Sequence, residues 1–115
     1  MRDPAERLRD IAEAIAAIER YSSCEKSAFE CDELLQTWFV RHLQIIGEAA
    51  RTIPQEIRDL GPTIPWSQIA GMRNILVHGY FDIDIDLVWD AATRDVPALK
   101  PAIEQMLSSL DLAGE

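Results

Sequence analysis

Side chains that can bind a phosphate and move a proton are concentrated in residues 73–80. Arg73 and His78 stand five positions apart, Asn74 follows the arginine, and Tyr80 lies two positions beyond the histidine. Arginine offers a rigid fork of N–H donors that matches phosphate oxygens. Histidine titrates near neutral pH, which suits proton transfer. This combination of residues therefore indicates chemistry at a phosphate group.

Helical periodicity over residues 66–79 divides these groups between two sides of one predicted helix. A narrow polar side carries Ser67, Gly71, Asn74 and His78. Asn74 and His78 are one turn apart, so a hydrogen bond between them could fix the histidine tautomer. Arg73 falls instead among apolar residues, and Gly79 can turn the chain out of the helix before Tyr80.

The same geometry predicts that the site needs two chains. On a helix, Arg73 and His78 lie about 140° and about 7.5 Å apart, so one helix does not bring both to a single phosphate. Two copies that cross at a two-fold axis could converge two arginines and two histidines, because Ser67 and Gly71 are small enough for a close approach. We expect a C2 homodimer with the site at the interface.

The elements that must position this stretch are all predicted to be helices of an up-and-down bundle, in a single domain of residues 1–115. The predicted helices begin at Pro4 with Asp3 as cap, and then cover about 29–53, 55–60, 65–79 and 83–110. Asp82 or Asp84 caps the last helix, Pro97 and Pro101 kink or split it, and the tail 111–115 frays. The acids at 82–86 do not fit a calcium loop, which needs glycine and glutamate where this chain has Leu87 and Thr93.

Composition narrows the classes of function. The formal net charge of −9 argues against a surface coated in nucleic acid, and no DNA contact is expected, but it leaves room for a local phosphate site or a basic protein partner. Cys24 and Cys31 are too few for a zinc site, so reduced thiols and no metal are expected. Without a signal peptide or an apolar run that could span a bilayer, a cytoplasmic protein is expected.

Three further residues could support the site. Arg41 and Arg51 could extend a phosphate track from Arg73, or they could form a solvated helix face. Glu48 could pair with Arg73, since a buried guanidinium needs a partner. A purely structural interpretation stays open for the motif as well: Arg73 would pair with Glu48, His78 would end a helix, and Tyr80 would pack.

A wider set of motifs resembles the HepT-like branch of the HEPN toxin ribonucleases. The segments that carry the resemblance are 45–50 (IIGEAA), 64–66 (IPW), 71–80 (GMRNILVHGY) and 88–89 (VW). They occur in the family's order over about Leu35 to Leu99. The family motif R-x-x-x-x-H-x-Y is present from Arg73 to Tyr80.

The resemblance implies a HEPN-like helical fold and a metal-independent endoribonuclease without a cofactor, the toxin of a toxin–antitoxin pair. His78 would be the acid/base group, Arg73 would stabilise charge on the phosphate, and Asn74 would assist them. The RNA 2′-hydroxyl would attack the adjacent phosphate. The partner would be a minimal nucleotidyltransferase (MNT) antitoxin that neutralises the toxin by adding AMP to Tyr80. The alternative is a non-catalytic binding subunit that presents or regulates the nucleotidyltransferase.

Overall fold

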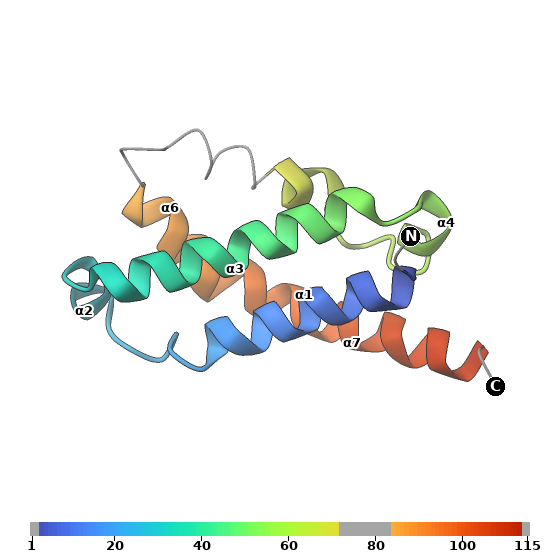
Figure 1. The fold of residues 1–115 in the computed structure, drawn as a ribbon, viewed down its shortest axis with the longest axis horizontal. Coiled ribbons are helices and arrows are strands. Elements are labelled where there is room, and N and C mark those ends of the chain that lie inside the picture. The colour runs from blue at the N-terminus through green and yellow to red at the C-terminus, as the bar shows by residue number, and fades with distance from the viewer. Residues whose placement is uncertain (1–2, 72–83, 114–115) are drawn as a thin grey trace.

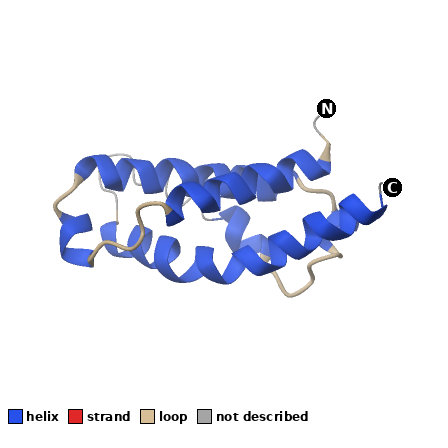
Figure 2. Cartoon of the chain, turned by 90° about the horizontal axis from the view of Figure 1, so that it is seen from below, coloured by secondary structure: helices blue, strands red, loops and turns tan. Residues whose placement is uncertain are grey.

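The computed structural model describes residues 3–71 and 84–113, and these residues are helical with no strand (Figures 1 and 2). The long helices are α1 (Pro4–Glu19), α3 (Glu33–Thr52) and α7 (Val96–Ala113). Figure 1 shows them alongside one another, with α1 antiparallel to the other two. Three short helices are α2 (Lys26–Glu30), α4 (Gln55–Arg58) and α6 (Ile85–Asp90), and residues 66–71 are also helical. The all-helical prediction is confirmed for this part of the chain.

The core lies along the seam between the three long helices. Its largest fully buried side chains are Leu8, Ile11, Ile15, Ile18, Phe29, Phe39, Leu43, Ile46, Val88, Ile103 and Met106. The spacing of these residues within each helix is that of one helical face, so the burial that the periodicity predicts is the burial observed. None of the buried residues in the described part is polar or charged.

Helix α1 begins where its sequence predicts, and side chains of α3 and α7 bind it near its other end. The Asp3 carboxylate accepts a hydrogen bond of 3.0 Å from the Ala5 amide, and Pro4 occupies the first turn. At the other end of the helix, Lys100 lies 3.1 Å from the carboxylate of Glu19 and so ties α7 to α1. The indole of Trp38 on α3 donates to the Ala17 carbonyl over 2.8 Å.

The predicted helix 29–53 is wrong at its start. Phe29 belongs to α2, and α3 begins only at Glu33, where the Asp32 carboxylate caps the Leu35 amide at 3.0 Å. Phe29 is fully buried because its ring stacks on Phe39 at 5.2 Å and meets Trp89 of α6 at 5.1 Å. Aromatic packing between three helices therefore places Phe29 in a helix of its own.

The last predicted helix, 83–110, is one continuous path with an irregular turn. Asp84 is the cap, as one of the two predicted alternatives, and accepts from the Leu87 amide at 3.0 Å. Residues Ala91–Asp95 form a π-helix, named η1, just before Pro97. Because proline lacks an N–H, the regular bond from residue 97 to the Thr93 carbonyl cannot form, which favours a wider turn there. Helix α7 keeps Pro101 inside it and continues to Ala113, beyond the predicted end.

The other predicted helices agree in part. Helix α4 ends at Arg58, shorter than the predicted 55–60, and the predicted helix 65–79 is seen from residue 66 to residue 71.

At the start of α6, the exposed Lys26 of α2 lies 2.8 Å from Asp86, and that hydrogen bond raises the pKa of the lysine. Within the described segments, none of the helices combines the length and apolar character needed to cross a bilayer.

Gly61 leaves no room for a side chain, and this gives a test of the packing around it. A Cβ at this position would lie 2.6 Å from the Met106 sulfur and 3.0 Å from Cδ1 of Ile64. We expect Gly61→Ala to lower the free energy of unfolding by about 1–3 kcal/mol in urea titrations, because the buried methionine must move. Gly71→Ala is the control, since a Cβ there meets no atom within 4 Å in the part of the chain that the structure describes; an equal loss in both variants would contradict this account.

Candidate functional site

The four motif residues predicted to do chemistry, Arg73, Asn74, His78 and Tyr80, lie outside the described residues. What the structure does describe is the helical turn 66–71 that precedes them in the chain and the surfaces around it. Gly71, the last described residue before the motif, is partly exposed, and a Cβ built on it meets no atom of the described residues within 4 Å. Among the described residues, space is therefore open beside the small residue that the helical periodicity assigns to a close approach.

The start of this helical turn is fixed by Trp66. The indole is buried, with 8% of its surface exposed, and its N–H donates to the Gly61 carbonyl over 3.0 Å. The Ile69 amide donates to the Pro65 carbonyl over 3.0 Å, which begins the helix directly after the proline. Gly61 in turn packs against Met106 of α7. The turn is thereby anchored to the loop before it and to the end of the bundle.

Arg58 joins the same anchor to the end of α3. Its guanidinium donates to the carbonyls of Ile53 at 3.0 Å and Ala50 at 2.8 Å, and more weakly to that of Arg51 at 3.4 Å. Its Cζ lies 5.9 Å from the centre of the Trp66 ring. The final carbonyls of a helix lack partners within the helix and carry partial negative charge, so a cation is favoured there. Arg58 is not part of any of the sequence motifs. Its position, shortly after the predicted end of a helix, is the one sequence feature that could have indicated a basic residue capping that helix.

The supporting residues predicted on α3 lie on its outward side. Arg51 and Glu48 form an ion pair of 3.2 Å, and both are substantially exposed. The pairing predicted for Glu48 was with Arg73, which lies outside the described residues; the pair seen here is a neighbour on the same helix. Such exposed pairs contribute little to stability, roughly 0–1 kcal/mol.

Arg41 opens into a shallow groove between α1 and α3, of about 470 Å³. Arg7, Asp10, Gln44 and Glu48 also line it. Neither Arg7 nor Arg41 takes part in an ion pair within the residues that the structure describes. The two acids balance the two arginines, so the groove is not a strongly basic track.

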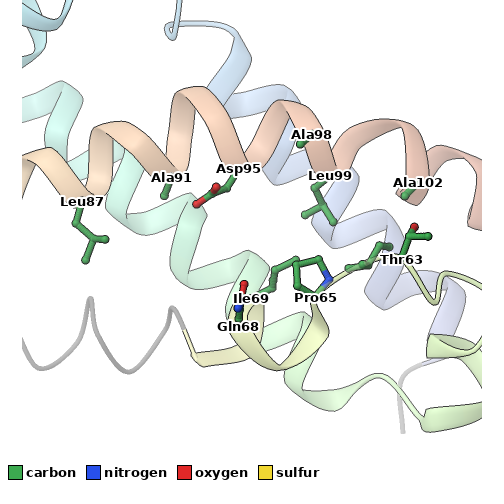
Figure 3. Close-up of a pocket in the computed structure, with 11 residues that line it drawn as sticks. Thr63, Pro65, Gln68, Ile69, Leu87, Ala91, Asp95, Ala98, Leu99 and Ala102 are labelled. Carbon is green, nitrogen blue, oxygen red and sulfur yellow. The ribbon is translucent and has the colours of Figure 1, made fainter.

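A second depression, of about 390 Å³, lies between residues 63–69 and the path from α6 to α7 (Figure 3). Its floor on α7 is made of small side chains, Ala98 and Ala102, and Leu87 stands at one edge. Asp95 is the one ionisable group among its described lining residues. A single carboxylate without a second acid or base does not supply paired proton transfer, so this depression is not a catalytic site by itself.

The described residues do not form a metal site or a site for thiol chemistry. Within residues 3–71 and 84–113, no group of three or more His, Cys, Asp or Glu side chains could hold a metal ion. Cys24 and Cys31 are free thiols, the first partly buried and the second exposed. His42 on α3 is partly buried; its Nδ1 lies 2.8 Å from the Trp38 carbonyl and its ring 4.3 Å from the Trp38 ring.

Comparison with known proteins places this helical chain in a family. The family model described as "Ribonuclease HepT-like" matches residues 11–106, so the chain belongs to the HepT-like family. The resemblance found in its motifs is thereby confirmed. The match begins within α1 and ends within α7, so it covers α3 in full and the larger part of the bundle.

Similar proteins carry names that agree with this family. The chain is 42% identical over 101 residues to "Probable ribonuclease HepT" of Thermococcus cleftensis, and the aligned residues cover 86% of this chain and 91% of the relative. It is 38% identical over 104 residues to "Putative RNase MJ1380" of Methanocaldococcus jannaschii, covering 90% and 95%. A further relative from that organism, "Gamma-glutamylcyclotransferase and putative RNase MJ0434", is 37% identical over 105 residues; this chain spans about half of it, 47%. No solved structure matches.

Proposed function

We propose that this chain is a metal-independent endoribonuclease toxin that works as a homodimer. The observation that carries the proposal is the Arg73-to-Tyr80 motif within a chain of the HepT-like family. Relatives covered over nearly their whole length are named as ribonucleases, which supports RNA as the substrate. The region also follows a firmly anchored helical turn, as a site that needs defined geometry requires.

The proposed reaction is an internal transfer at one phosphate of RNA. The 2′-oxygen forms a bond to phosphorus and the bond from phosphorus to the 5′-oxygen breaks, leaving a cyclic phosphate and a 5′-hydroxyl. His78 takes the proton of the 2′-hydroxyl, and the imidazolium of the two-fold-related copy can protonate the departing oxygen. Arg73 stabilises the extra charge on the phosphate oxygens, and Asn74 orients the histidine.

The first test is cleavage itself. The purified chain should cut single-stranded RNA in the presence of EDTA and leave products with cyclic phosphate ends. His78→Ala should lower the rate by at least about 10²-fold, the contribution of an acid/base group, while its circular dichroism and unfolding midpoint stay as in the wild type. Undiminished cleavage by the variant would refute the assignment, and an inert wild-type chain would favour the non-catalytic binding subunit.

The homodimer follows from the close-approach side that contains Gly71. Since a Cβ at this residue meets no atom of the described residues within 4 Å, Gly71→Leu should leave the monomer folded but obstruct a second helix. We expect sedimentation velocity to show a monomer and the RNA assay to show loss of cleavage. Gln105→Leu, at an exposed position of α7, is the matched control and should stay dimeric. A dimeric, active Gly71→Leu variant would exclude this side as the interface.

We also propose that an MNT-type nucleotidyltransferase neutralises the toxin by adding AMP to Tyr80. Each AMP adds a phosphate charge beside the proposed cleft, and like-charge repulsion then disfavours RNA. The net charge of −9 suits a basic surface on such a partner.

Incubation with the partner and ATP tests this regulation. Mass spectrometry should show AMP on the wild-type chain and none on Tyr80→Phe, and cleavage by the wild type should fall as the modification accumulates. The Phe variant should keep cutting RNA under the same conditions. Labelling of the Phe variant would place the modification on another residue.

A further inference from the structure

One side chain links the end of α3 to the turn that leads into the motif, and it is Arg58. The guanidinium lies between two structures: the carbonyls of Ala50 and Ile53 on one side and the ring of Trp66 on the other. It is partly buried and reaches these groups from α4. Two nitrogens of the guanidinium bind the carbonyls and its carbon lies over the Trp66 ring, so one rigid group sets the position of residue 66 relative to α3.

The contacts are more than a helix cap requires. A cap needs only a donor near the last carbonyls, and the Thr52 hydroxyl already donates to the Ala49 carbonyl over 3.0 Å. The cation–π contact with Trp66, with Cζ 5.9 Å from the ring centre, adds a second direction of restraint. Trp66 is itself held by its bond to Gly61 at 3.0 Å. The group therefore fixes both distance and orientation at the start of the turn.

The link joins the end of α3 to the turn that precedes the motif. On α3, the carbonyls bound by Arg58 are those of Ala50, Arg51 and Ile53, at the C-terminal end of the helix. On the other side, the helical turn 66–71 runs into the motif within a few residues of the sequence. A change in the angle at Trp66 would change the direction of the helical turn 66–71, which comes directly before the motif in the sequence.

We propose that Arg58 is a positioning residue for RNA cleavage: it sets the helical turn before the motif against the end of α3. The proposal rests on the proposed function, and it predicts that lysine cannot replace arginine. Lysine keeps the charge and can bind a carbonyl, but it lacks the fork and the planar face. Catalysis is sensitive to displacements of about 1 Å, which can cost about 10²-fold in rate.

The experiment compares the kinetics of two variants with a single change of arginine to lysine. In Arg58→Lys, kcat on a short RNA should fall by roughly 10- to 100-fold, and KM should change little because Arg58 does not contact RNA. Arg94→Lys is the matched control, because Arg94 is exposed and its ion pair among the described residues is with Asp90, four positions earlier in the chain. Millimolar guanidinium added to Arg58→Ala should restore part of kcat, which a loss of stability alone would not allow.

A second pair of measurements separates positioning from stability. Ile103→Val weakens the core of α7 without changing a side chain of the link, and it should keep its kcat at temperatures where it is folded. Hydrogen exchange at the amides of residues 66–71 should be faster in Arg58→Lys than in Arg94→Lys. Trp66→Phe, which loses the bond to Gly61, should behave like Arg58→Lys and carries the test if that variant does not fold.

The outcomes are distinct. Wild-type kcat in Arg58→Lys, or an equal loss of kcat in Ile103→Val, overturns the proposal while the ribonuclease assignment stands. A wild-type chain that cuts no RNA overturns the proposed function, and hydrogen exchange then decides alone: unchanged exchange in Arg58→Lys overturns the link, and faster exchange supports it.

Discussion

The burial of one side of α3 is the constraint on which the rest of the structure depends. Phe39, Leu43 and Ile46 are at most 1% exposed, and α1, α2 and α6 all pack against this helix. A helix of 20 residues in such a position leaves its last carbonyls at the edge of the core, where water cannot satisfy all of them. The chain returns through α4 and supplies Arg58 to those carbonyls. The same requirement that completes α3 thus brings the chain to Trp66 and the region before the motif.

The helices could be predicted from sequence because their determinants are local. Apolar residues at helical spacing marked the buried faces, and the caps at Asp3 and Asp84 were recognisable from residue type and position. The break at Asp32 was not, because Phe29 continues the apolar pattern of α3. Only the stacking of Phe29 on Phe39 and Trp89, which joins segments far apart in the chain, shows why α2 is separate.

The residue types of the proposed site come from the sequence. Arg73 and His78 stand out by their chemistry and spacing, and they stay predictions because they lie outside the described residues; the wider motifs identified the family. The predicted pairing of Glu48 with Arg73 also stays a prediction, and within the described residues Glu48 pairs with Arg51, one turn away on the same helix. Arg58 was missed because its partners are backbone carbonyls, which have no signature in the side chains of a sequence.

The π-helix at Ala91–Asp95 has a consequence for the phase of the helix that follows. The buried residues Val88, Ala92 and Val96 recur every four positions, and on a regular helix at about 100° per residue the last would face about 80° away from the first. The wider turn absorbs this difference, so α7 can keep Leu99, Ile103 and Met106 buried in the core. These five residues thus change the direction in which the buried side of the helical path faces. Before them, α6 packs against α2 and α3; after them, α7 packs against α1.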